Sequence, residues 1–181
     1  MVTPGPDEHA GTPQWRVAAR VLDPEVPVLT IEDLGILRAV EVGPGGAVTV
    51  TITPTYSGCP AMEAIRDDVL AAFAAAGHHD VQVRMVLSPA WTTDWLTEAG
   101  RRKLEEYGIA PPARGADALG GRADPLDRPG MRGPVALSLS VRCPQCGSPD
   151  TRELSRFGST ACKSLWACSA CREPFDHFKA I

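Results

Sequence analysis

Apolar residues follow two different periods along the first hundred positions of this chain. They recur every three or four residues over 13–22 and again over 61–76, which predicts two amphipathic helices. Between them, residues 47–53 alternate apolar side chains with threonines, which predicts a half-buried strand. A glycine-rich turn at 43–46 connects this strand to an earlier one at 36–42.

Two further elements follow the second helix. Residues 81–87 form a predicted third strand, and a last helix is expected to start after Thr93 and to end near residue 107. Because a helix joins the second strand to the third, the right-handed crossover rule predicts that these two strands run parallel. The first helix has a defined start, since Thr12-Pro13 supplies an N-cap followed by proline at the first helical position.

Proline and glycine divide the chain into four predicted segments. Residues 1–11 are rich in both and are expected to be a disordered tail. Residues 12–107 carry the periodic pattern and form the predicted first domain. Residues 108–134 show almost no apolar periodicity and indicate a linker, which leaves 135–181 as a small second module.

Composition limits the classes of partner. The 181 residues are 44% hydrophobic, so a real core is expected in the N-terminal part. A formal net charge of −4 and an aromatic content of 6% argue against a nucleic-acid partner. No window is long and apolar enough to span a bilayer, and residues 1–8 lack the basic start and apolar run of a signal peptide. We therefore expect a cytoplasmic protein without a membrane partner, in which paired cysteines indicate metal ligands rather than disulfides.

Two Cys-x-x-Cys pairs near the end of the sequence give its strongest chemical signal. Their thiolates, from Cys143, Cys146, Cys168 and Cys171, can close a tetrahedral shell around one zinc ion, with Zn–S bonds of about 2.3 Å. Because this shell has no open position, the zinc is expected to be structural and to drive folding of the module. A rubredoxin-like iron site or a bound cluster would use the same ligands. A further cysteine, Cys162, is expected to pack inside the module or to act as an alternative ligand.

A second candidate site surrounds Cys59, at the predicted start of the second helix. The dipole and the free N–H groups of a helix N-terminus favour a thiolate at this position. Thr55, Tyr56 and Ser57 add hydroxyl groups to the same loop. The local pattern leaves two interpretations open: a reactive or metal-ligating thiol, and a small buried residue at a helix start.

Two carboxylates flank a proline directly after the first helix, at Asp23-Pro24-Glu25. Taken alone, this pattern is more typical of a solvated turn than of a functional site.

Longer strings of residues carry a family resemblance. Asp23-Pro24-Glu25-Val26-Pro27, Asp33-Leu34-Gly35-Ile36 and the loop from Thr53 to Pro60 resemble the small iron–sulfur assembly domain family, which includes SufT. The run Trp91-Thr92-Thr93-Asp94-Trp95 and the terminal cysteine module narrow the resemblance to the PaaD family, encoded with the phenylacetyl-CoA epoxidase of bacterial phenylacetate degradation. The resemblance covers residues 13–112 and 135–181. It implies an α/β (α+β) fold, in which a small mixed sheet covered by helices is followed by a four-cysteine zinc ribbon.

The same resemblance implies a function. The chain would be a maturation factor for iron–sulfur or other metal centres of the epoxidase system, and not an enzyme itself. The loop cysteine is the residue implicated in function across the wider family, which here is Cys59. In the family fold Asp23 and Glu25 lie near that loop, and Thr55 and Ser57 are further candidate supporting residues.

One protein thiolate cannot complete the four-ligand shell of a cluster. Cys59 would therefore hold iron or a cluster transiently, with other ligands from a second copy of the chain, glutathione or the client protein. The expected partners are the oxygenase or reductase subunits of the epoxidase, iron–sulfur carrier proteins and, in a homodimer, another copy of the chain. The alternative hypothesis is a non-catalytic adaptor, whose zinc ribbon docks on the oxygenase or reductase while Cys59 is only a packed helix start.

Overall fold

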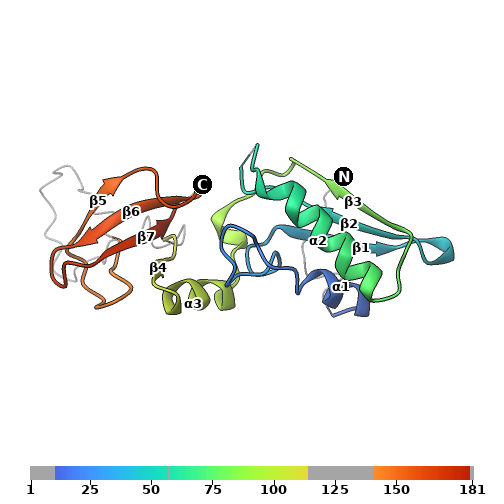
Figure 1. Ribbon diagram of the computed structural model, residues 1–181, viewed down its shortest axis with the longest axis horizontal. Helices are drawn as coiled ribbons and strands as arrows, with labels where there is room; N and C mark the ends of the chain where they lie inside the picture. The colour runs from blue at the N-terminus through green and yellow to red at the C-terminus, as the bar shows by residue number, and fades with distance from the viewer. Residues whose placement is uncertain (1–10, 57, 114–140, 180–181) are drawn as a thin grey trace, which may run out of the picture. The chain divides into compact units, whose positions relative to one another are not determined.

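The computed structural model describes residues 11–56, 58–113 and 141–179, and it divides between Tyr107 and Gly108 into two compact units (Figure 1). Residues 1–10 of the predicted tail, 114–134 of the predicted linker and 135–140 of the predicted second module lie outside the described residues. Among the described helices, none is both long and apolar enough to cross a bilayer.

The first unit is built on a three-stranded sheet. Its strands β1 (Leu37–Val42), β2 (Val48–Ile52) and β3 (Val81–Met85) stand in the order β1-β2-β3. β1 and β2 pair antiparallel, whereas β2 and β3 pair parallel, so the sheet is mixed. The crossover between β2 and β3 is the helix α2 (Ala61–Ala75), which confirms the parallel pairing expected from the sequence.

Helix α2 supplies one side of the core of this unit. Figure 1 shows it lying across the sheet. Its buried side chains recur at helical spacing, and the apolar residues of β2 alternate with threonines, so both elements have an apolar face. The residues of this core include Met62, Ile65, Val69, Phe73, Val48, Val50 and Ile52.

Two predicted helices are shorter in the structure than the periodicity suggests. Helix α1 (Pro13–Ala18) begins as expected, with the Thr12 hydroxyl accepting from the Trp15 N–H at 3.1 Å. It ends four residues early, because Leu22 forms a β-bridge with Thr30. The last helix, α3 (Glu98–Glu106), starts at a Thr97 cap and is preceded by the separate 3-10 turn η3 (Thr93–Trp95). A further 3-10 turn, η2 (Pro44–Gly46), connects β1 to β2.

The second unit is a four-stranded sheet in the order β4-β7-β6-β5. Its strands are β4 (Ile109–Ala110), β5 (Thr151–Ser155), β6 (Lys163–Cys168) and β7 (Pro174–Phe178), with β5, β6 and β7 forming an antiparallel meander (Figure 1). β4 pairs parallel with β7. This pairing corrects the predicted linker at its start, because two residues assigned to 108–134 belong to the second sheet.

Candidate metal centre and candidate thiol site

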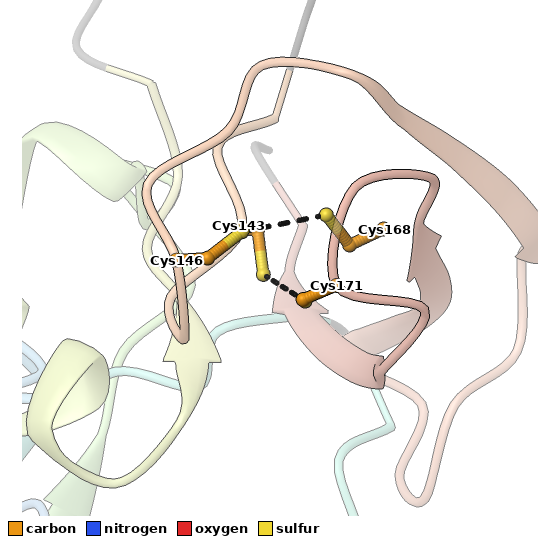
Figure 2. A group of neighbouring side chains, drawn as sticks. All are labelled: Cys143, Cys146, Cys168 and Cys171. Carbon is orange, nitrogen blue, oxygen red and sulfur yellow. Dashed lines mark hydrogen bonds between the residues drawn. The ribbon is translucent and has the colours of Figure 1, made fainter.

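The four paired cysteines meet at one end of the second unit. Cys143 and Cys146 lie in the turn before β5, whereas Cys168 ends β6 and Cys171 follows in the turn before β7 (Figure 2). Their Sγ atoms all lie within 4.8 Å of one another. The Cys143–Cys171 pair is 3.7 Å apart and the Cys146–Cys168 pair 3.6 Å. A tetrahedron with Zn–S bonds of about 2.3 Å has S–S edges of about 3.8 Å, so this donor set fits one zinc ion.

The two cysteine turns have the same backbone structure. In the first, Cys143 donates its N–H to the Ser148 carbonyl at 3.0 Å, and Gly147 donates back to the Cys143 carbonyl at 2.8 Å. In the second, Cys168 donates to Glu173 and Arg172 donates to Cys168, each at 3.0 Å. Gly147 and Arg172 occupy equivalent positions and both have positive φ, at 72° and 65°. This matched pair of turns aims two thiols from each side at one point.

Backbone donors in these turns stabilise thiolates. The N–H of Cys171 points at Cys168 and lowers the pKa of that thiol to about 7. The N–H of Glu173 acts in the same direction on Cys171, but burial and the neighbouring thiols raise the pKa of Cys171 to about 12. Four thiolates at this separation repel one another, so a divalent cation is needed before the last proton leaves.

Cys162 lies outside this cluster. Its side chain is buried and its Sγ lies 3.0 Å from the Thr160 hydroxyl. Within the part of the chain that the structure describes, the four paired cysteines form the one cluster suited to a metal ion, and it does not include Cys162. The geometry favours the packed-thiol interpretation over the alternative ligand.

Cys59 lies immediately before α2, where Pro60 is the N-cap and Ala61 the first helical residue. The thiol is half-buried. Burial is the largest influence and raises its pKa; the nearby carboxylates of Glu25 and Asp23 raise it further. The Ala61 N–H lowers the pKa, as a helix start should, but does not prevail. The expectation that this position favours a thiolate is therefore wrong for the free protein, because desolvation and negative charge outweigh the helix terminus.

The structure brings Asp23 and Glu25 within electrostatic range of Cys59. The Asp23 side chain is buried, and its Oδ1 accepts from the N–H groups of Glu25 at 2.9 Å and Val26 at 2.7 Å. These two hydrogen bonds close the turn that follows α1. Asp23 is therefore a buried structural residue and does not belong to a simple solvated turn. Thr55 is buried in the same loop. Ser57 lies outside the described residues.

These groups do not form a ready-made metal shell. Among the described residues, Asp23, Glu25 and Cys59 do not bring three ligand atoms close enough together to hold a metal ion. Any ion at Cys59 would need further ligands from another molecule or from a rearrangement of the loop.

One buried charged residue in the first sheet, Arg38, is not predicted by any sequence motif. Arg38 is buried in β1 at a bulge, with its guanidinium carbon 3.6 Å from the centre of the Trp95 ring. Its Nη1 and the buried Thr53 Oγ1 have no hydrogen-bond partner. An arginine among the apolar residues that begin the strand was the available signal, but periodicity alone could not show that its aliphatic stem and its guanidinium are both covered.

Comparison with known proteins places both units. A family profile described as "PaaD zinc beta ribbon domain" matches residues 129–179, and one described as "Iron-sulfur cluster assembly protein" matches residues 17–86. A protein of Escherichia coli described as a candidate 1,2-phenylacetyl-CoA epoxidase component is 46% identical over 168 residues, which cover 92% of this chain and 91% of that protein. The chain belongs to the PaaD family.

Further comparisons each cover about half of this PaaD-family chain. An Fe-S protein maturation auxiliary factor of Porphyromonas gingivalis is 37% identical over 90 residues, covering 49% of the chain and 85% of the factor. A solved domain of unknown function from Bacillus anthracis overlaps 50% of the chain and 87% of its own length, with 24% identity and a TM-score of 0.48. The mixed α/β fold and the cysteine cluster of a zinc ribbon are thus those expected for the family.

Proposed function

We propose that this chain is a maturation factor that handles iron or an iron–sulfur cluster at Cys59 for the phenylacetyl-CoA epoxidase system. The proposal is supported by the family membership and by relatives named as Fe-S protein maturation factors. The structural observation that carries it is a half-buried thiol whose pKa is raised beside two carboxylates. The chain itself has no catalytic role in this proposal.

The electrostatics of the thiol suit a metal ligand better than a nucleophile. A catalytic nucleophile needs a lowered pKa, so that the thiolate is present at neutral pH. Cys59 has the opposite shift and keeps its proton until something displaces it. A ferrous ion would do so, because its positive charge is attracted by Asp23 and Glu25 and stabilises the thiolate directly.

An incomplete ligand set is appropriate for transfer. A resident metal site is closed by several protein ligands, as in the four-cysteine cluster. At Cys59 the remaining ligands would come from a carrier protein, glutathione, a second copy of the chain or the client oxygenase or reductase. Because these ligands can exchange, the iron or cluster can pass to the client protein instead of remaining tightly bound at Cys59.

The test compares two single cysteine variants in cells that lack the endogenous protein. Cys59→Ser should lower epoxidase activity, and the iron content of the purified oxygenase and reductase, at least tenfold, because a hydroxyl is a poor ligand for iron. Zinc content should remain one ion per chain. Anaerobically purified wild-type protein, but not this variant, should show iron and sulfide absorbance after reconstitution.

Cys162→Ser is the matched control. This thiol is buried, lies outside the metal cluster and keeps a hydrogen-bonding neighbour in Thr160 after replacement. It should support near wild-type activity. Full activity of Cys59→Ser would contradict the proposal and favour the adaptor hypothesis, in which the ribbon docks and Cys59 only packs.

A further inference from the structure

The turn between β5 and β6 exposes an aromatic side chain to solvent. Phe157 is 78% exposed, more than any other large hydrophobic side chain in the described part of the chain. Leu154, in β5, is 45% exposed. We call Leu154, Arg156, Phe157 and Lys179 the ribbon tip. A phenylalanine this exposed contributes little to the stability of the ribbon, because it removes almost no apolar surface from water.

The backbone that carries Phe157 is held in place on both sides. Its own N–H donates to the Ser155 hydroxyl at 3.1 Å, and the next residue, Gly158, donates to the Lys163 carbonyl at 2.9 Å. The hydroxyl of Ser159 donates to Asp176 at 2.7 Å, which ties the turn to β7. The aromatic ring is therefore presented from a fixed turn rather than from a loose loop.

Gly158 shows how tightly this turn is packed. A Cβ added there would lie 2.8 Å from Asp176 Oδ1 and 3.1 Å from the Lys163 backbone carbon. A larger residue would require the Asp176 carboxylate and the Lys163 backbone to shift. An exposed aromatic residue on a rigid support is the usual form of an interface anchor, since little conformational entropy is lost when it is buried.

One cation lies beside the ring, and another precedes it in the sequence. Lys179 Nζ lies 5.7 Å from the ring centre and donates to the Arg156 carbonyl at 3.3 Å, and the Arg156 side chain is exposed. The nearby carboxylate of Asp176 is already engaged by Ser159 and lies 4.0 Å from the buried Lys163 Nζ. The tip thus combines an apolar centre with a cationic edge, although the whole chain has a net charge of −4.

We propose that the ribbon tip docks into an apolar pocket with a carboxylate rim on a protein of the epoxidase system. Phe157 fills the pocket, Leu154 extends the apolar contact, and Arg156 and Lys179 face the acidic rim. The inference rests on the proposed function in one respect, namely that the protein that carries this pocket is the client that receives the metal. A single aromatic residue with two cations does not make the stacking platform and charged groove that single-stranded nucleic acid needs.

The experiment measures binding of the full, zinc-loaded chain to the purified oxygenase and reductase subunits of phenylacetyl-CoA epoxidase, by biolayer interferometry at low and high salt. Phe157→Ser should raise Kd at least tenfold, whereas Phe157→Leu should retain most of the affinity. Arg156→Glu should slow association and reduce its salt dependence. Zinc content and circular dichroism should be unchanged, because these side chains are exposed.

Leu87→Ser is the matched control, since Leu87 is 62% exposed but belongs to the first unit. It should change Kd less than twofold. Wild-type affinity of Phe157→Ser, or no binding of the wild-type chain to either subunit, would overturn the proposal. So would a Phe157-dependent dimer of the chain alone in light scattering, or Phe157-dependent binding to a fluorescent thymidine oligonucleotide.

Cys59→Ser, run in the same assay, separates this proposal from the preceding one. It should bind the client normally and fail only in maturation. If Phe157→Ser binds the client with wild-type affinity and Cys59→Ser still matures the client, then both proposals fail. If Phe157→Ser binds with wild-type affinity but Cys59→Ser does not mature the client, then only the docking proposal is wrong.

Discussion

At the scale of single residues, burial changes the chemistry of several titratable groups. His177 in β7 is an example outside both candidate sites. Burial lowers its pKa to about 4, from a usual value of 6.5. Its ring contacts Trp166 edge-on, and its Nδ1 lies 3.3 Å from the Ser164 hydroxyl. The neutral imidazole is therefore part of the packing of the ribbon.

This shift predicts that the ribbon becomes less stable in mild acid. Between pH 6.5 and about 4 the unfolded chain protonates this histidine and the folded chain does not, so the free energy of unfolding falls as pH falls through that window. The loss should be on the order of 1 to 3 kcal/mol. Urea denaturation of zinc-loaded wild type and His177→Phe at several pH values would measure it, and identical pH slopes in the two proteins would contradict the prediction.

At the scale of elements, the segment that precedes β1 is fixed against the region around η3 and α3. Asp33 accepts from Lys103 Nζ at 2.5 Å and from the Thr30 N–H at 3.0 Å. Burial by itself raises the pKa of Asp33, but these partners outweigh it and leave the pKa below its usual value. Gly35 has φ of +68°, and a Cβ there would lie 2.6 Å from the Trp95 Cβ. The Asp-Leu-Gly-Ile string thus has a structural explanation in close packing.

Two glycine substitutions should separate backbone conformation from packing. Gly46→Ala changes a residue with φ of +88° and open space around it, so it should cost only about 1 kcal/mol of stability. Gly35→Ala adds a clash with the Trp95 backbone and side chain and should cost about 2 to 4 kcal/mol. Thermal and urea denaturation would give both values, and equal losses would show that Trp95 moves aside without cost.

At the scale of the whole molecule, the two units have different sources of stability. The first unit buries a continuous set of apolar side chains between α2 and its sheet. The second has a small buried cluster around Cys143, Cys168, Phe175 and Ala110, in which two of the four members are thiols of the metal site. A metal ion held by these thiols would therefore replace part of an ordinary core.

Removal of zinc should unfold the ribbon and leave the first unit folded. After treatment with a strong chelator, backbone amides of β5, β6 and β7 should lose hydrogen-exchange protection, while those of α2 and β2 keep it. Cys146→Ser should reproduce the effect without a chelator, because three thiolates hold zinc more weakly than four. Uniform loss of protection across the chain would contradict this division.

Local spacing in the sequence determined much of this protein. The Cys-x-x-Cys pairs specify their own turns, so the four cysteines that cluster in the structure could be identified without any tertiary information. The Thr12 cap, the strands on either side of residues 43–46 and the helix after Pro60 also depend on near neighbours, and the structure has them within a residue or so. Periodicity was a poor guide to where α1 ends and where α3 begins, because the β-bridge at Leu22 and the cap at Thr97 depend on hydrogen bonds that a hydrophobic pattern does not show.

Only the tertiary structure decided the chemistry of the other groups. The pKa of Cys59 depends on how deeply the thiol is buried and on carboxylates more than thirty positions earlier in the sequence. The same holds for the covered guanidinium of Arg38 and for Ile109–Ala110, which pair with residues 67 positions later in the sequence. Desolvation and charge–charge interaction act through space, whereas a sequence motif records only neighbours along the chain. For that reason the sequence showed which atoms could bind a metal, and the fold set how readily each of them gives up its proton.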